Sequence, residues 1–157
     1  MPNYWLFKSE PDSYGFDRLE REGHTEWSGV RSFQARNNMR SMQLGDLGFF
    51  YHSSTKETGI AGICRVVRLA YPDFTARDPK SPYFDRRSTA DKPIWEMVDV
   101  AYERPLPRFV TLRELRANAA LAPTMVLLRK GMRLSVQPVA EREWRLVLAM
   151  AERPASA

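Results

Sequence analysis

The chain has 157 residues and a formal net charge of +5, and 43% of its residues are hydrophobic. That is enough sequence for one domain with its own core, without disulfides or metals. Because there is one cysteine, Cys64, and only two histidines, an internal disulfide and an ordinary structural zinc site are excluded. We therefore expect no metal and no cofactor.

The predicted elements form one domain over residues 1–151, followed by a flexible tail at 152–157. In chain order they are a strand at 4–10, helices at 16–22 and 32–42, strands at 46–53 and 59–69 that form a hairpin, a strand at 94–103, a helix at 111–118, a strand at 133–139 and a helix at 140–151. Pro11 stops the first strand and Gly23 ends the first helix. Residues 71–93 carry four prolines and are predicted as a long loop.

Helical periodicity identifies the side chains that face the core. In the second helix these are Ala35, Met39 and Met42. Thr111 and Glu114 form a capping box that starts the third helix. In the last helix the spacing predicts a core face of Ala140, Trp144, Val147, Leu148 and Ala151. The order of elements predicts an α+β fold, with a mostly antiparallel mixed sheet that can curl into a small barrel.

Enzyme signatures are absent, and we expect no catalytic residues. The sequence contains no phosphate-binding glycine loop and no nucleophile motif. Cys64 lies in an apolar strand, where a free cysteine is usually only buried. His52 ends a strand, where a structural role is favoured over that of a base or ligand.

Three polar segments are candidates for a binding site. Arg133, Ser135 and Gln137 alternate with Leu134 and Val136, so they are expected on one face of a strand. Lys8, Ser9 and Glu10 end the aromatic first strand. Trp27 precedes a Ser-Gly turn and the arginines Arg31, Arg36 and Arg40, a combination suited to stacking on a base and contacting phosphates. The alternative for each segment is ordinary: a wet strand face, a strand-end turn, or a core tryptophan beside solvated arginines.

Several motifs together resemble the EVE domain family. They are NYWLFKSEP, WSGVRSFQARNNMR, GDLGFFYHS, GIAGICRV, VDV and RLSVQPV, and they span almost the whole chain. Two positions depart from the family pattern: Ser32, where Asn is usual, and Met132, where a small residue is usual. We expect Ser32 to alter one hydrogen bond near the pocket and Met132 to change packing only.

The resemblance implies a PUA-like mixed β-barrel flanked by helices, related to YTH and ASCH domains. It also implies a non-enzymatic pocket that reads a modified base, in particular methylated or hydroxymethylated cytosine in DNA. The expected base pocket consists of Ser9, Glu10, Trp27, Tyr51, His52, Ser53, Ser135 and Gln137. The expected phosphate contacts are Lys8, Arg31, Arg36, Arg40 and Arg133, with residues 71–93 as a mobile basic flap.

The expected partner is nucleic acid, with modified DNA favoured over RNA. An RNA-binding module and a small-molecule or nucleotide-binding domain remain alternatives. The apolar run Tyr4–Phe7 is too short to span a membrane. We expect a monomer in the cytoplasm, or in the nucleus if the source is eukaryotic.

Overall fold

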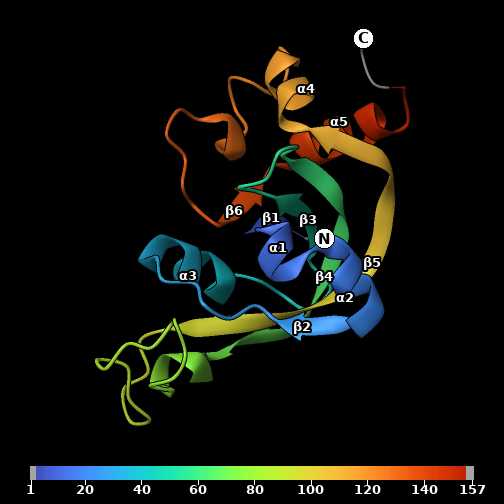
Figure 1. The fold of residues 1–157 in the computed structure, drawn as a ribbon. Helices are drawn as coiled ribbons and strands as arrows, with labels where there is room; N and C mark the ends of the chain where they lie inside the picture. The colour runs from blue at the N-terminus through green and yellow to red at the C-terminus, as the bar shows by residue number, and fades with distance from the viewer. Residues whose placement is uncertain (1–2, 155–157) are drawn as a thin grey trace.

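The computed structural model describes residues 3–154, and its elements form one mixed sheet with helices on both faces (Figure 1). In chain order the elements are β1 (Tyr4–Ser9), α1 (Pro11–Tyr14), α2 (Phe16–Glu22), β2 (His24–Glu26), α3 (Phe33–Arg40), β3 (Leu47–His52), β4 (Gly59–Pro72), the 3-10 turn η1 (Phe74–Arg77), β5 (Glu96–Thr111), α4 (Leu112–Ala117), the 3-10 turn η2 (Val126–Leu128), β6 (Val136–Val139) and α5 (Glu141–Ala151). The predicted α+β class is correct.

The sheet has the strand order β2-β5-β4-β3-β1-β6. Only β1 and β3 pair in parallel, and all other neighbours are antiparallel. The predicted hairpin of β3 and β4 is present. Four register shifts between β4 and β5 mark bulges, and bulges bend and twist a sheet. The two long strands therefore curve around the core, as Figure 1 shows.

Helix α3 bridges β6, at one edge of the curled sheet, and β5, next to the other edge. Asn38 donates from Nδ2 to the carbonyl of Val136 in β6 at 2.8 Å. On its other side, Arg40 pairs with Glu96 at the start of β5. Because α3 fills the gap between these strands, the sheet and the helix together form the predicted small barrel.

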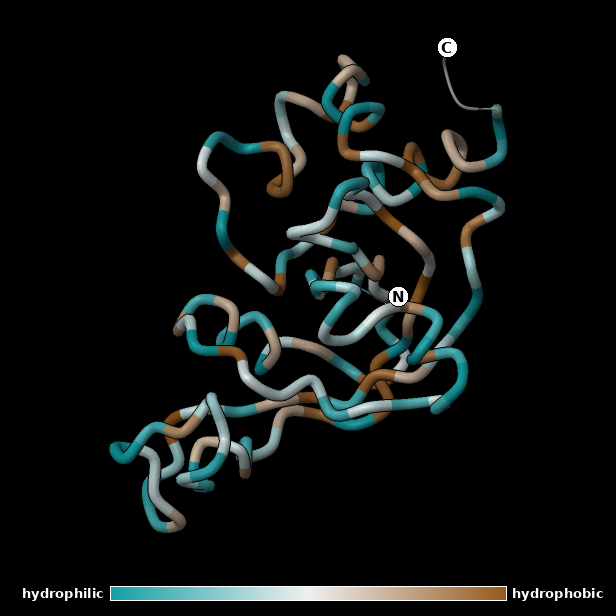
Figure 2. Tube along the Cα trace, viewed as in Figure 1, coloured by the Kyte–Doolittle hydropathy of each residue, from teal (hydrophilic) through white to brown (hydrophobic). Residues whose placement is uncertain are grey.

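Two apolar layers follow from strand alternation. In β1, Phe7 packs with α2 and α3, whereas Leu6 packs on the opposite face with α4 and α5. Figure 2 shows hydrophobic colour along the strands and a mostly hydrophilic loop between β4 and β5. Burial of these layers supplies the main stabilisation of the fold.

Several element predictions need correction. Strand β6 begins at Val136 rather than at residue 133. Strand β5 continues to Thr111, well beyond the predicted end at 103. Ala140 is exposed at the start of α5, so it does not belong to the core face. Of the predicted tail, residues 155–157 lie outside the described part of the chain.

Candidate nucleic-acid interface

A cleft of about 890 Å³ opens between the end of β1, the segment before α3 and the loop before β6. We call it the Trp27 cleft. Its lining is formed by Lys8, Ser9, Glu10, Ser13, Tyr14, Arg18, Glu22, Thr25, Glu26, Trp27, Ser28, Gly29, Val30, Ser53, Ser54, Tyr83, Met132, Arg133 and Ser135. The size lies in the range of small-molecule and base pockets.

Trp27 forms an apolar part of the wall and is held rigidly. Its ring meets Phe7 edge-on at 5.2 Å and Phe50 at 5.5 Å between centroids. Its backbone N–H donates to the carbonyl of Val98 at 2.7 Å. Only 8% of the residue remains exposed. Trp27 is therefore a core residue that also lines the cleft, and its stacking on a base stays a prediction.

Serine hydroxyls give the cleft a polar rim. Ser9 donates from Oγ to the carbonyl of Tyr14 at 2.6 Å, which leaves its lone pairs available as acceptors. Among the described residues, the hydroxyls of Ser53 and Ser135 have no hydrogen-bond partner. These groups can donate to or accept from the polar edge of a bound molecule.

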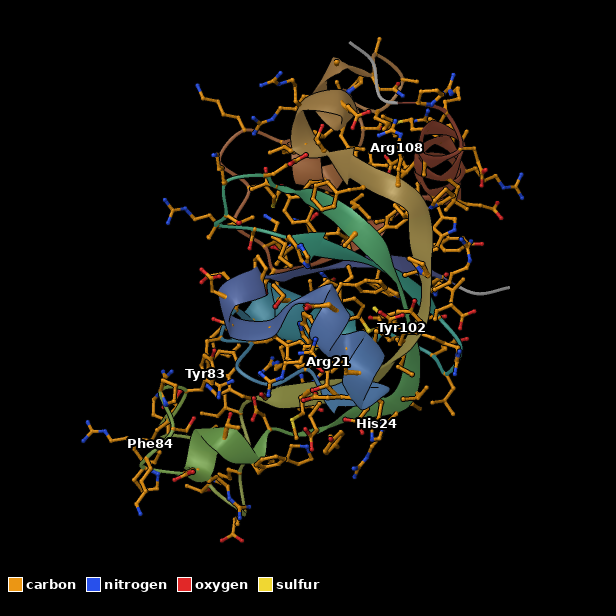
Figure 3. All side chains as sticks on the ribbon, turned by 45° about the vertical axis from the view of Figure 1, so that its right-hand side comes forward. Arg21, His24, Tyr83, Phe84, Tyr102 and Arg108 are labelled. Atoms are coloured by element: carbon orange, nitrogen blue, oxygen red, sulfur yellow. The ribbon has the colours of Figure 1, made fainter. Side chains whose placement is uncertain are left out.

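Tyr83, from the loop that follows η1, also lines the cleft, and Figure 3 labels it on that loop together with Phe84. Gly29 has a φ of +82°, and a Cβ at this position would lie 2.8 Å from the Tyr83 ring. Glycine is therefore required both by the backbone conformation and by the contact. The aromatic ring thus lies directly against the backbone of the segment that carries Trp27.

Asp73 joins this loop to the Trp27 segment. Its side chain is fully buried and accepts from the backbone N–H of Gly29 at 2.8 Å and from Arg31 Nη1 at 3.1 Å. It also accepts from the N–H and the hydroxyl of Thr75 at 2.8 and 2.6 Å. The start of the loop between β4 and β5 is therefore fixed by hydrogen bonds to the Trp27 segment, and these bonds do not support the expected mobility of the loop there.

Charges of both signs surround the cleft. Glu22 accepts from the Tyr14 hydroxyl at 2.7 Å and from Arg18 Nε at 3.0 Å, and these bonds lower the pKa of its carboxyl group. Desolvation by burial lowers the pKa of Lys8. Mixed charges suit a ligand with both donors and acceptors better than a simple anion.

Seven of the expected site residues line the Trp27 cleft together: Lys8, Ser9, Glu10, Trp27, Ser53, Arg133 and Ser135. Tyr51 does not. It follows Phe50 in β3 and therefore points to the opposite face of the sheet. There it lines a second pocket, of about 530 Å³, with Lys8, Leu112, Arg116, Leu127, Leu128, Arg129, Lys130, Gly131 and Met132. We call this second pocket the cationic pocket.

His52 and Gln137 also lie outside the Trp27 cleft. His52 accepts from the backbone N–H of Phe16 at Nε2, over 3.1 Å, and burial lowers the pKa of its imidazole. Gln137 is 1% exposed, and its Nε2 donates to the carbonyl of Leu134 at 2.7 Å. It lies opposite Leu6, on the face that α5 covers, so Gln137 does not share a polar face of the cleft with Ser135 as expected.

Three arginines that were expected to contact phosphates also form contacts with other residues of the protein. Arg31 donates to the carbonyl of Tyr83 at 2.8 Å and pairs with Asp73. Arg36 donates to the carbonyl of Ile94 at 2.8 Å, and Arg40 pairs with Glu96. These side chains anchor the β4–β5 loop and the start of β5 to α3.

Tyr83 and Met132 are cleft residues that were not assigned to the pocket from the sequence. An aromatic between two prolines in a polar loop was a usable signal for Tyr83. Met132 lines both pockets, and its carbonyl accepts from Lys8 Nζ at 3.5 Å. Met132, which departs from the family pattern, therefore lies in the wall of the site, where its side chain can affect ligand binding as well as packing.

The cysteine of the chain, Cys64, does not line the cleft. Cys64 is fully buried, and burial raises the pKa of its thiol to about 12, so the nucleophilic thiolate is not formed at neutral pH. Within residues 3–154, no group of three or more His, Cys, Asp or Glu side chains is placed to hold a metal ion. In the same part of the chain, no helix has the length and apolar character needed to cross a membrane.

Comparison with known proteins agrees with this architecture. Thymocyte nuclear protein 1 from Homo sapiens is 40% identical over 174 residues, which cover 99% of this chain and 77% of the human protein. The crystal structure of the human THYN1 protein in complex with 5-methylcytosine-containing DNA matches with a TM-score of 0.91 at 38% identity, covering 98% of this chain and 99% of that one. A Pseudomonas putida protein matches with a TM-score of 0.91 at 49% identity, covering 94% and 99%.

A more distant match extends the likeness of the fold. The YTH domain of the Zygosaccharomyces rouxii MRB1 protein, solved with N6-methyladenosine RNA, has a TM-score of 0.54 at 15% identity. It covers 99% of this chain and 88% of its own, and it shows that the fold resembles that of a YTH domain. The family model that matches residues 3–150 is the EVE domain, and the chain belongs to the EVE domain family.

Proposed function

We propose that this protein is a non-enzymatic reader of modified cytosine in DNA, and that the Trp27 cleft holds the modified base. The observation that carries the proposal is the cleft itself, in which a rigid tryptophan lies beside unpaired serine hydroxyls. The relation to the human protein, whose crystal structure contains 5-methylcytosine DNA, supports this choice of ligand.

The base must leave the duplex to reach such a cleft, at a cost of about a few kcal/mol. Trp27 and Tyr83 would contact the faces of the base, and together they replace the pairing of Trp27 with Tyr51 that the sequence suggested. The hydroxyls of Ser9, Ser53 and Ser135 would bind its polar edge. Apolar atoms of the wall would contact the methyl group, as proteins do for thymine methyl groups.

The side chains of the cleft support binding rather than catalysis. Neither His24 nor His52 lines the cleft, and the imidazole of His52 accepts from the backbone of Phe16. The serines of the cleft therefore lack the Ser–His pair that commonly activates a serine nucleophile. The site is built from one chain, and we propose that the protein reads DNA as a monomer.

The test is a fluorescence-anisotropy titration with matched DNA oligonucleotides that carry cytosine, 5-methylcytosine or 5-hydroxymethylcytosine, at two salt concentrations. We expect a preference for a modified base that persists at higher salt, because phosphate contacts alone are salt-labile and blind to the base. Equal affinity for all three oligonucleotides would contradict the proposal. An RNA oligonucleotide of the same sequence tests whether a 2′-hydroxyl improves binding, as it would in an RNA reader.

Two variants separate the cleft from the surrounding charge. Ser135→Ala removes a hydroxyl from the rim, and we expect it to reduce the preference for the modified base. Arg133→Ala removes a charge from the same wall, and we expect similar losses on modified and plain DNA. If both variants changed the two affinities equally, base recognition would have to lie elsewhere.

A further inference from the structure

The cationic pocket on the α4 side of the sheet carries four positive side chains and no acidic one. They are Lys8, Arg116, Arg129 and Lys130, and the other lining residues are apolar apart from Tyr51 and Gly131. Like charges in one hollow repel each other, and a bound anion relieves that repulsion. The composition of the pocket therefore indicates an anionic ligand.

These cations are not used by the fold. By contrast, the two ion-paired arginines with the least exposed side chains, Arg31 and Arg108, pair with the carboxylates of Asp73 and Glu114. Within residues 3–154, Arg116, Arg129 and Lys130 form no ion pair and no side-chain hydrogen bond, and Lys8 has only its 3.5 Å contact to a carbonyl. Their donors remain available to a ligand.

The backbone holds two of the cations at a tight turn. The N–H of Met132 donates to the carbonyl of Arg129 at 3.2 Å, and Gly131 has a φ of +71°. A positive φ at the third residue is the requirement of a type II turn. Since no neighbouring atom crowds the Cβ position of Gly131, the glycine serves this backbone conformation rather than a close contact.

The cationic pocket adjoins the Trp27 cleft, because Lys8 and Met132 line both. Lys8 is the second-last residue of β1, next to Ser9, and its ammonium group lies 5.9 Å from the ring centre of Tyr51. A ligand that fills the cleft therefore ends close to a hollow lined with arginine and lysine. In nucleic acid, the group next to a base and its sugar is a phosphate.

We propose that the cationic pocket is a phosphate site that takes the backbone phosphate next to the base in the Trp27 cleft. This assignment rests on the proposed function, and it replaces Arg31, Arg36 and Arg40 as the phosphate contacts. Arg116 and Arg129 supply planar, bidentate donors, while Lys8 and Lys130 supply point charges. The site fixes the register of the strand and does not distinguish one base from another.

The experiment is a coupling cycle between the protein and the DNA. A 5-methylcytosine oligonucleotide carries one neutral methylphosphonate, which is moved stepwise along the backbone on both sides of the modified base. Each oligonucleotide is titrated by anisotropy against the wild type, Arg129→Ala and Arg116→Ala. The control is Arg104→Ala, which removes the same charge. Arg104 is an exposed residue of β5 that lines neither pocket.

We expect Arg129→Ala to weaken binding of the unmodified backbone about tenfold, the size of one charge-assisted hydrogen bond. Neutralising one particular phosphate should weaken the wild type by a similar factor, and the two losses should not add. Arg129→Ala should also reduce the salt dependence of log K by about one phosphate contact. Additive losses at every phosphate, or equal behaviour of Arg129→Ala and Arg104→Ala, would overturn the assignment.

The outcomes separate this site from the base-reading function. If cytosine and 5-methylcytosine oligonucleotides bind alike while the coupling persists, the proposed function fails and the phosphate site stands. In a parallel NMR experiment without DNA, inorganic phosphate is titrated into ¹⁵N-labelled protein. The amide signals of Gly131 and its neighbours should shift. Shifts without any coupling to an oligonucleotide phosphate would assign the pocket to free phosphate and overturn its role on the DNA backbone.

Discussion

Replacement of Asp73 by alanine tests how the aromatic wall of the Trp27 cleft is held. The carboxylate has no exposed surface and accepts four hydrogen bonds, from the backbone of Gly29, from Arg31 and from two groups of Thr75. The bonds from Gly29 and Arg31 connect two segments that are more than 40 residues apart. Alanine removes all four and leaves the Arg31 guanidinium without its carboxylate.

The structure sets the size of the effect. Removal of one partner from a buried ion pair costs about 3–5 kcal/mol. The side chain of Arg31 is 23% exposed and keeps its bond to the carbonyl of Tyr83, so water and that carbonyl compensate in part. We therefore expect the free energy of unfolding to fall by about 3 kcal/mol. With a urea dependence of about 2 kcal/mol per molar, the midpoint should fall by about 1.5 M.

Urea denaturation followed by tryptophan fluorescence measures this loss. Asp91→Ala is the matched control, because Asp91 is an exposed carboxylate in the same loop, without an ion pair among the described residues. It should shift the midpoint very little. A loss below about 1 kcal/mol for Asp73→Ala would show that the cost of burying the carboxylate cancels its bonds, and would refute the anchoring role.

Three further predictions concern other parts of the molecule. Gly29→Ala adds a Cβ 2.8 Å from the Tyr83 ring at a positive φ. Thermal unfolding should show a larger loss of stability than for Gly45→Ala, where the φ is +88° but no atom lies within 4 Å of the added Cβ. Equal losses of stability would show that the contact with Tyr83 adds nothing to the effect of the positive φ. His52 accepts a hydrogen bond from the Phe16 N–H, and burial lowers the pKa of its imidazole, so the unfolded state binds more protons than the folded state. Stability should therefore fall as the pH drops below about 6.5 towards the folded pKa. His52→Gln should flatten this pH dependence, and an unchanged slope would assign it to other groups. Cys64, with a pKa of about 12 and no exposed surface, should react with a thiol reagent only as fast as the protein opens, so a reaction rate independent of urea would contradict its burial.

Local patterns were sufficient for most elements of the fold. The capping box at Thr111 and Glu114 is present with both hydrogen bonds, at 3.2 and 2.9 Å, and it starts α4 as predicted. Ala35 and Met39 are fully buried, as their helical spacing indicated. Such signals act within a few residues, so one sequence can carry them.

Long-range contacts were not predictable in the same way. The three residues of β2 have no strand pattern and become a strand only by pairing with β5, some 75 residues later. Arg31 and Arg36 look like solvated side chains until the carbonyls of Tyr83 and Ile94 are placed beside them. The same holds for the site: the sequence identified Trp27 and the serines, but it could not show that Tyr51 belongs to the opposite face of the sheet.

The position of β1 within the sheet has a consequence for how the chain acquires its structure. One edge of β1 pairs with β3, and the other pairs with β6, whose residues Val136–Val139 come 129 to 135 positions after their partners. During synthesis, that second edge stays open until nearly the whole chain has been made. Contacts of such sequence separation slow folding, and open strand edges invite aggregation. Chaperone dependence and the solubility of nascent or truncated forms should therefore be governed by the four residues of β6, although they contribute little surface to the finished protein.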